Sequence, residues 1–258
     1  MDVTATIVIY KNDPKILNNA IRSFLTSALE ISLFIIDNSP DDELKNQIVV
    51  DSRITYIHMG RNLGFGKAHN IGMSKSIDLR AKYHLVLNPD IIFKPGVIDK
   101  IFGFMQSNEE FGLLMPKVVY PNGELQYLCK RPPSLSVLLL RRFMPKAIQD
   151  RFKRKLDEYE YRDHDYNQMI FDVPYLSGCF MFFRNAVLQQ LGGFDQKIFM
   201  YMEDADITYR TLTYSRTIYY PDVEVTHHFA KGSYKNLKLM YYNIHGAIVY
   251  FRKWGWRF

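Results

Sequence analysis

Apolar and polar positions follow two alternating periods over residues 1–90 of the chain. The β-branched run TATIVIY ends in the turn sequence KNDP, and the next segment carries apolar residues at helical spacing from Ile16 to Leu25. Three further apolar runs, SLFIIDNS, RITYIHM and KYHLVLNPDI, are typical of strands, the first of them buried. Between them DDELKNQIVV favours a helix, and GFGKAHNIGMSKSI favours a loop that runs into a helix. Four such strand–helix units predict an α/β fold with a mostly parallel sheet flanked by helices on both faces.

The pattern becomes less regular after Gly112. The segment GLLMPKVVYPNGELQY predicts a hairpin around its Pro-Asn-Gly turn, and the stretch from Lys130 to about Asp165 favours surface helices because it has few strand signals. A strand, a helix and a Gly-Gly stop are predicted within FDVPYLSGCFMFFRNAVLQQLGGFD, and a further helix within FMYMEDADITYRTL. Because no repeat or linker interrupts the chain, we expect one domain over residues 1–258.

Polar side chains follow each of the four strands predicted in the first part of the chain. Ligands of open parallel sheets bind outside the carboxyl ends of the strands. The residues at these ends are Asn12, Asp37, Asn38, Arg61, Asn62, Asn88 and Asp90. The sequence therefore predicts a ligand site at this edge of the sheet.

Three acids, Glu203, Asp204 and Asp206, lie together at the start of a predicted helix. Acids in a first turn complement the helix dipole, and Asp206 can pair with Arg210 one turn later. The aromatic residues of GGFDQKIFMYM in front of them favour a second interpretation, because apolar surroundings raise the pKa of a carboxylate and suit a general base. The residues alone leave both interpretations open.

The sequence Asn88-Pro89-Asp90 also has two interpretations. It fits an ordinary turn after a strand. A carboxylate at this strand end also suits Mg²⁺ or Mn²⁺ bridging a diphosphate, because hard cations need few protein ligands when phosphate oxygens complete the shell.

The loop RNLGFGKAHN lacks the third glycine of a dinucleotide fingerprint and follows the third predicted strand, so we do not expect NAD binding. Its glycines favour close approach of the backbone to a ligand, with Arg61 near a phosphate. His227 and His228 follow the strand-like segment VEVT, where neighbouring side chains point to opposite faces, so only one of them is expected to face a site.

Composition limits the class of protein. The chain has 258 residues, of which 47% are apolar and 23% charged, and this excludes a wholly disordered or fibrous protein. Two cysteines are too few for a disulfide framework, so a reducing, cytoplasmic compartment is expected. No signal peptide is predicted, and no apolar run approaches the roughly 20 residues that span a bilayer.

Basic residues outnumber acidic ones by only 33 to 27, an excess too small to imply nucleic acid. They concentrate between Lys130 and Lys155, where nine basic residues accompany one acid, Asp150. This segment fits a solvated charged face, an anionic membrane surface or nucleic acid. Its mixture of apolar and basic residues favours the membrane surface.

Six segments in this order resemble the family 2 glycosyltransferases, in the branch of bacterial rhamnosyltransferase-like enzymes that build surface polysaccharides. They are TATIVIYKND, IIDNS, RNLGFGKAHNIG, VLNPDI, LSGCFMFFRNAVLQQLGGFDQKIFMYMEDADITYR and VEVTHH, and the resemblance extends from about Thr4 to Tyr250. It implies a GT-A fold in which a nucleotide-sugar-binding half, residues 1–110, continues into a smaller acceptor-binding and catalytic half, residues 111–258. Segment 130–155 of the second half would face the membrane.

The same resemblance implies roles for individual residues. Asp204, in the pair with Glu203, would be the catalytic base, and Asp90, with His227, would hold Mg²⁺ or Mn²⁺. Asn88 stands where the family has the first acid of its DxD motif. The nucleotide-sugar site would comprise Tyr10, Asn12, Asp37, Arg61, Asn62, Gly64, Asn88 and Asp90, with Asp37 bonding the pyrimidine base.

The resemblance also implies the reaction. An inverting, metal-dependent hexosyltransferase would move L-rhamnose from dTDP-rhamnose, or a hexose from a UDP-sugar, to a hydroxyl of a lipid-linked oligosaccharide in O-antigen or capsule synthesis. It would be peripheral at the inner face of the cytoplasmic membrane and have no nucleic-acid partner. Two alternatives are a sugar nucleotidyltransferase, which would need a glycine-rich basic loop where this chain has KNDPK, and a non-catalytic assembly scaffold, against which the intact acids argue.

Overall fold

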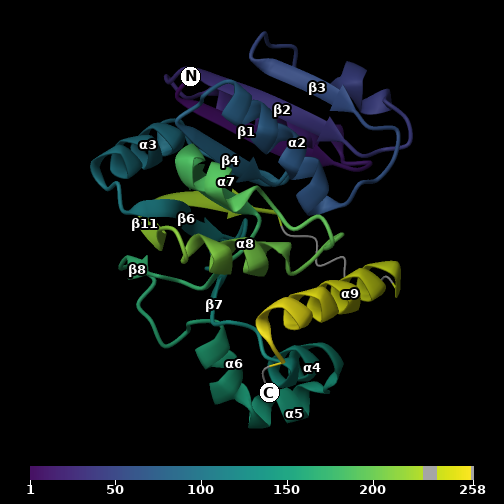
Figure 1. The fold of residues 1–258 in the computed structure, drawn as a ribbon, viewed down its shortest axis with the longest axis vertical. Helices are drawn as coiled ribbons and strands as arrows, with labels where there is room; N and C mark the ends of the chain where they lie inside the picture. Colours follow the sequence, from purple (N-terminus) through teal and green to yellow (C-terminus); the bar gives the residue numbers. More distant parts are fainter. Residues whose placement is uncertain (229–236, 257–258) are drawn as a thin grey trace.

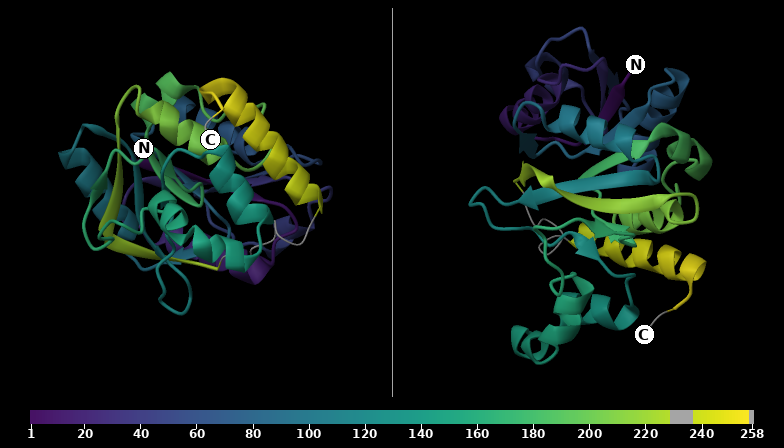
Figure 2. Two further views of the ribbon diagram at one scale, coloured as in Figure 1. Left: turned by 90° about the horizontal axis from the view of Figure 1, so that it is seen from below. Right: turned by 90° about the vertical axis from the view of Figure 1, so that its left-hand side faces the viewer.

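The structure, a computed structural model, describes residues 1–228 and 237–256 (Figure 1). Within these residues a nine-stranded sheet forms the centre of the molecule, with the strand order β3-β2-β1-β4-β10-β6-β11-β5 and with β8 paired to β11. A short second sheet joins β7 to β9. Helices cover both faces of the large sheet, as the sequence predicts (Figure 1 and Figure 2).

The first four strands are parallel to one another. Their bounds are β1 (Val3–Ile9), β2 (Ile31–Asp37), β3 (Ile54–His58) and β4 (Tyr83–Leu87). Because β1 pairs with β2 and β4, and β2 pairs with β3, all four carboxyl ends lie at one edge of the sheet. The helices α1 (Pro14–Leu25) and α2 (Phe65–Asp78) follow β1 and β3, so the predicted strand–helix order is confirmed here.

The segment DDELKNQIVV forms only a short 3₁₀ helix, Glu43–Gln47, so the full helix predicted for it is wrong. Leu44 is the one buried residue of this turn, and the backbone is extended again at Ile48. The residues that follow, Val49 and Val50, are β-branched like Ile48 and lose rotamer freedom in a helix, which explains the early end.

The second part of the chain completes the sheet. Its strands are β5 (Ile91–Phe93), β6 (Phe111–Val119), β7 (Cys129–Lys130), β8 (Ile170–Phe171), β9 (Tyr175–Leu176), β10 (Phe180–Arg184) and β11 (Arg216–His227). β10 runs antiparallel between β4 and β6, and it thereby joins the strands of the two parts of the chain into one sheet.

The hairpin predicted around Pro-Asn-Gly is only partly formed. The turn exists, because the Tyr120 N–H donates to the Glu124 carbonyl over 2.8 Å, but the returning chain makes a single bridge between Val119 and Leu125. β11 pairs along one side of β6, and on the other side β10 pairs only with Leu113 and Leu114.

Two apolar layers hold the helices on the sheet. The helices of this part are α3 (Val97–Ser107), α7 (Asn185–Leu191), α8 (Glu203–Thr211) and α9 (Leu237–Trp254). α1 and α3 pack on one face, where Leu17, Ile21 and Ile101 are fully buried. α2, α7 and α8 pack on the other face through Met73, Leu188 and Ile207.

The basic segment forms three short helices, α4 (Leu135–Phe143), α5 (Lys146–Arg151) and α6 (Lys153–Tyr159). They form a lobe that projects from the end of the molecule opposite the N-terminal strands (Figure 1 and Figure 2). This confirms the prediction of surface helices. Across residues 1–228 and 237–256, every helix is too short or too polar to cross a bilayer.

Candidate active site

Asp37 lies at the carboxyl end of β2, where it is fully buried. Its Oδ1 accepts the Ser39 N–H over 2.8 Å, and the Tyr56 hydroxyl of β3 donates to its Oδ2. Burial, and then the adjacent Asp37 carboxylate, raise the pKa of Tyr56 above its ordinary value, so this phenol stays a donor. Sequence reasoning missed Tyr56, which the register of β2 and β3 brings beside Asp37.

The turn after β1 lies next to Asp37. Asn12 Oδ1 accepts the Tyr10 N–H over 2.8 Å, and the N–H of Lys11, which has a φ of 54°, donates to Ser39 Oγ over 3.0 Å. The Tyr10 ring is 49% exposed, so it is available to a ligand. The structure thus brings together Tyr10, Asn12 and Asp37, as the sequence predicts for these strand ends.

The loop before α2 is tied to the same region. Asn38 Nδ2 donates to the Gly64 carbonyl over 3.2 Å, and Asn62 Oδ1 accepts the Gly64 N–H over 2.9 Å. Arg61 is exposed at the start of the loop. Gly64 has a φ of +85°, and a Cβ there would lie 2.3 Å from the Phe199 carbonyl oxygen. Gly64 therefore allows a close approach of this loop to the Phe199 segment.

Asp90 and His227 meet because β5 pairs with the end of β11. Asp90 Oδ1 lies 3.3 Å from His227 Nε2, and His227 Nδ1 contacts Gln126 Oε1 over 3.0 Å. Burial opposes protonation of His227, but Cys179 and the Asp90 carboxylate outweigh it and raise its pKa to about 10. His227 is buried and His228 is exposed, which confirms that only one of the pair turns inward.

A divalent cation fits this pair only with help from other ligands. Among residues 1–228 and 237–256 no group of three or more His, Cys, Asp or Glu side chains could hold a metal ion. Asp90 is partly accessible and Asn88, with its N–H bonded to the Cys179 carbonyl over 2.9 Å, lies just before it. One carboxylate with substrate phosphates and water is a normal Mg²⁺ or Mn²⁺ environment, and His227 would have to lose its proton to join it.

The acids at the start of α8 have opposite environments. Asp204 is partly exposed, and its Oδ2 accepts the Gly178 N–H over 3.0 Å. Glu203 is buried, and its Oε2 has no hydrogen-bond partner in the described part of the chain. Burial and the neighbouring Asp204 raise the pKa of Glu203 well above its usual range. Glu203 is therefore held in its neutral form, and Asp204 is the more accessible of the two carboxyl groups.

The backbone just before these acids is unusual. Tyr201 and Met202 both have left-handed conformations, with φ of 70° and 73°. Such conformations cost free energy in non-glycine residues and persist only where surrounding contacts enforce them. Gly246 of α9 supplies one such contact, because a Cβ on it would lie 2.3 Å from the Tyr201 carbonyl oxygen.

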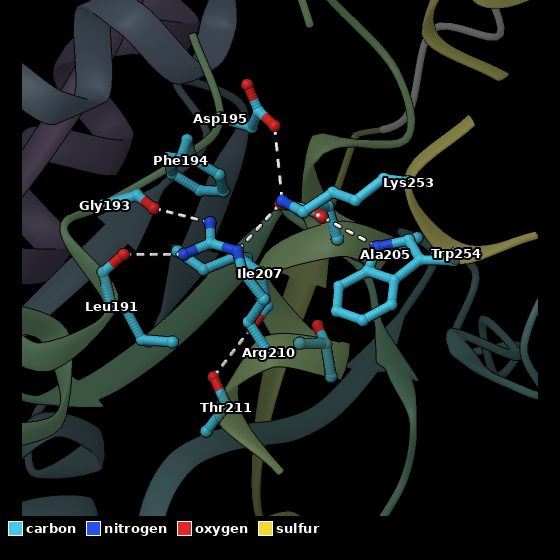
Figure 3. A network of polar contacts seen from close by, with 12 residues as sticks. Leu191, Gly193, Phe194, Asp195, Ala205, Ile207, Arg210, Thr211, Lys253 and Trp254 are labelled. Atoms are coloured by element: carbon cyan, nitrogen blue, oxygen red, sulfur yellow. Dashed lines mark hydrogen bonds and ion pairs between the residues drawn. The ribbon is translucent and has the colours of Figure 1, made fainter. Parts of the chain in front are cut away.

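Asp206 has a structural role, which agrees with the first interpretation of the acidic cluster. Its fully buried carboxylate pairs with Arg210 Nε over 2.9 Å, and it also bonds Lys253 Nζ over 2.8 Å and Trp254 Nε1 over 2.9 Å. Arg210 donates further to the Leu191 and Gly193 carbonyls (Figure 3). This network fastens α9 to α8. The sequence predicts the pair of Asp206 with Arg210, which is confirmed, but not the contacts to Lys253 and Trp254, because these residues are distant in the chain.

A cavity of about 910 Å³ lies beside these groups. Its walls include His227 and Gln126 near the Asp90 pair, and Ser177, which precedes the Gly178 that binds Asp204. On its other side Lys130 and residues of the α4–α6 lobe complete the wall. A second cavity, of about 750 Å³ between α1, β5 and residues 222–226, contains none of the predicted site residues. Of these two cavities, only the first has a predicted site residue, His227, in its wall.

Comparisons with known proteins agree with this arrangement. The family model described as "Glycosyl transferase family 2" matches residues 5–192. The N-acetylglucosaminyl-diphospho-decaprenol L-rhamnosyltransferase of Mycobacterium tuberculosis is 27% identical over 219 residues, which cover 81% of this chain and 70% of that protein.

Two solved structures share the fold. GalNAc-T7 with UDP, GalNAc and Mn²⁺ superposes with a TM-score of 0.61 at 14% identity, covering 88% of this chain and 43% of that one. The mannosyltransferase PcManGT of Pyrobaculum calidifontis, with GDP-Man and Mn²⁺, gives a TM-score of 0.59 at 14% identity, covering 90% and 58%. These are GT-A folds, and the family model covers well over half of the chain. The chain therefore belongs to the family 2 glycosyltransferases.

Proposed function

We propose that this glycosyltransferase inverts the anomeric centre of a nucleotide-activated sugar as it transfers that sugar to a hydroxyl of a lipid-linked oligosaccharide, with Asp204 as the general base. One observation carries the proposal. The partly exposed Asp204 carboxylate is held by the N–H of Gly178, which follows Ser177 of the wall of the 910 Å³ cavity, while its neighbour Glu203 is buried and its pKa is raised. A single accessible base suits a single displacement at carbon.

The reaction balances with these groups. Asp204 accepts the proton of the acceptor hydroxyl as that oxygen attacks the anomeric carbon in line. The new glycosidic bond forms while the bond from this carbon to the donor phosphate oxygen breaks, and the nucleoside diphosphate leaves with the electron pair. The configuration inverts because attack and departure occur on opposite sides.

The donor would occupy the carboxyl ends of β1 to β4. Asp37 would accept from the pyrimidine ring, Tyr10 would cover the base or ribose, and Asn12 would line the same pocket. Exposed Arg61, with Asn62 and Gly64, would lie along the diphosphate. The name of the mycobacterial relative favours L-rhamnose as the transferred sugar, which agrees with the expected donor dTDP-L-rhamnose, and the UDP bound in GalNAc-T7 makes UDP-hexoses the second candidate.

Asp90 and His227 would hold Mg²⁺ or Mn²⁺, with Asn88 beside them, and the Mn²⁺ of both solved relatives supports this. When bound, the cation supplies positive charge to the departing diphosphate. Asp90 orients this site through its backbone as well, since its carbonyl accepts the His228 N–H over 3.0 Å.

Calorimetric titration with dTDP, UDP, GDP and NAD, each with and without Mn²⁺, tests the proposed function. We expect dTDP or UDP to bind, more tightly with Mn²⁺, and Asp90→Asn to remove only the metal-dependent gain. NMR of the product then reports the anomeric configuration. Absence of nucleoside diphosphate binding under every condition would contradict the proposal and favour a non-catalytic scaffold.

We also propose that the α4–α6 lobe attaches the enzyme to an anionic membrane surface, as a lipid-linked acceptor requires. Apolar side chains on the lobe are between 39 and 49% exposed, namely Leu139, Phe143, Met144, Ile148 and Phe152. Exposed cations lie among them, namely Lys146, Arg151, Lys153, Arg154 and Lys155. Apolar groups that enter the headgroup layer and cations that meet anionic lipid act together in such attachment.

Flotation with anionic liposomes tests this attachment. Replacing Lys146, Arg151 and Lys153 by Gln should release the protein, because each basic residue near the surface contributes about 1 kcal/mol. A control variant that replaces the exposed residues Lys15, Lys45 and Lys94 on the opposite half should float like the wild type. Unchanged flotation of the lobe variant would contradict attachment to the membrane through the basic residues of the α4–α6 lobe.

A further inference from the structure

Lys130 is a cation in the wall of the 910 Å³ cavity, and it has no role in the reaction proposed above. It ends β7, which pairs with β9 so that Lys130 lies opposite Tyr175. Its Nζ lies 4.6 Å from the centre of the Tyr175 ring, and the side chain is partly accessible toward the cavity. Within residues 1–228 and 237–256, none of the carboxylates forms an ion pair with Lys130.

The other cations of this cavity are already paired. Arg141 Nη2 lies 2.7 Å from Glu160 Oε1, and Arg162 Nε lies 2.8 Å from Glu160 Oε2. Burial and the nearby Arg141 lower the pKa of Lys130, while Asp204 and Glu160 act in the opposite direction. A partly buried ammonium without a carboxylate partner is unfavourable, and an anion bound in the cavity would compensate its charge.

The position of Lys130 indicates which substrate brings that anion. The cavity extends from His227, beside the candidate metal position, to Arg141 of α4, the first helix of the lobe proposed to meet the membrane. A lipid-linked acceptor carries its phosphates between the sugar and the lipid. With the sugar hydroxyl at Asp204 and the lipid toward the lobe, the phosphates fall between them, where Lys130 lies.

We propose that Lys130 binds a phosphate of the acceptor's diphosphate, so that this cavity is an acceptor-phosphate subsite. The inference rests on the proposed function, because it assumes a phosphate-bearing lipid acceptor. The donor carries the same chemical group, and the experiment must separate the two sources. A lysine suits the task as a compact point charge with three donors.

The experiment compares two acceptors with the same sugar, one linked through a diphosphate to a short prenyl chain and one a neutral alkyl glycoside. Lys130→Met should raise KM for the diphosphate acceptor at least tenfold, and leave KM for the donor and for the neutral glycoside within twofold of wild type. Lys130→Arg should have a KM for the diphosphate acceptor close to that of the wild type. The matched control is Lys117→Met, since Lys117 pairs with Glu224 outside the cavity.

A second measurement does not require transfer. Calorimetry of decyl diphosphate binding to enzyme saturated with nucleotide should show at least tenfold weaker binding in Lys130→Met. Three results would each contradict the proposed phosphate subsite: an equal rise of KM for both acceptors, a raised KM for the donor, or unchanged affinity for decyl diphosphate in Lys130→Met. Failure of the wild type to bind any nucleotide is a different result, and it would overturn the proposed function itself.

Discussion

Glu203 and Asp204 are adjacent in the chain, yet the structure gives their carboxyl groups different states. Asp204→Asn should lower kcat at least about a hundredfold, because it removes the proton acceptor, and leave nucleotide affinity unchanged. Glu203→Gln is the control. It should keep most activity because the buried Glu203 is already neutral. Single-turnover transfer measures the rate of each variant, and calorimetry measures its nucleotide affinity. Full activity of Asp204→Asn would contradict the role of Asp204 as the base.

Two buried histidines, His69 and His84, differ in their hydrogen bonding and should therefore differ in their contribution to stability. Both ring nitrogens of His69 lack a hydrogen-bond partner in the described residues, whereas His84 contacts Thr4 Oγ1 over 2.8 Å and Thr6 Oγ1 over 3.1 Å. His69→Leu should therefore raise the free energy of unfolding in urea by about 1–2 kcal/mol, while His84→Leu should lower it by about 1–3 kcal/mol. A lower stability of His69→Leu would mean that the ring is satisfied in solution.

Residues near the site differ in how well the sequence predicts them. Tyr10, Asn12, Asp37 and Asn62 follow predicted strands, so the rule for parallel sheets is enough to bring them together. Partners such as Tyr56 and Gly178 could not be found in this way. Tyr56 depends on the register of β3 against β2, and Gly178 on the packing of α8 against the chain before β10.

At the scale of elements, α9 controls the geometry of the acids although it contains neither of them. Gly246→Ala would place a methyl group against the Tyr201 carbonyl, so it should cost about 1–3 kcal/mol of stability and reduce kcat. The same substitution at Gly103 of α3, where a Cβ meets nothing within 4 Å, should stabilise the protein by about 0.5–1 kcal/mol. Thermal unfolding and initial rates compare the pair. Equal changes of stability and kcat in the two variants would mean that α9 does not stabilise the left-handed backbone at Tyr201 and Met202.

The sequence predicts individual elements better than their partners. Apolar patterning identifies β1 to β4, α1, α2 and α8, although β3 lies at the edge of the sheet and has no fully buried residue. It misplaces a helix on DDELKNQIVV, where β-branched residues end the turn, and it overextends the hairpin after β6, where the returning chain makes only one bridge. The attachment of α9 through Asp206 depends on contacts between residues 48 positions apart, which a periodicity does not contain.

For the whole molecule, the neutral buried histidines predict how stability varies with pH. Burial lowers the pKa of His84 to about 3 and that of His69 well below its ordinary value. The unfolded chain binds these protons near pH 6.5 and the folded chain does not, so the contribution of these two neutral rings to stability is present above this pH and is lost as pH falls below it. The raised pKa of His227 acts in the opposite direction.

Each histidine should contribute about 1 kcal/mol of loss between pH 7 and pH 5.5. Urea unfolding at the two pH values measures the loss, and His69→Leu should show a smaller decrease than the wild type by this amount. An identical decrease in wild type and variant would mean that His69 is accessible to protons in the folded state.

The insertion of β10 between β4 and β6 has a consequence for synthesis of the chain on the ribosome. β4, buried along its whole length, ends at Leu87, but its neighbour β10 begins only at Phe180. At about 5–20 residues per second, the emerging chain exposes an apolar, unpaired strand edge for roughly 5–20 s before its partner appears. Chaperone supply and elongation rate, rather than the stability of the finished fold, should therefore govern the yield of native enzyme, and chains that stop before Phe180 should aggregate.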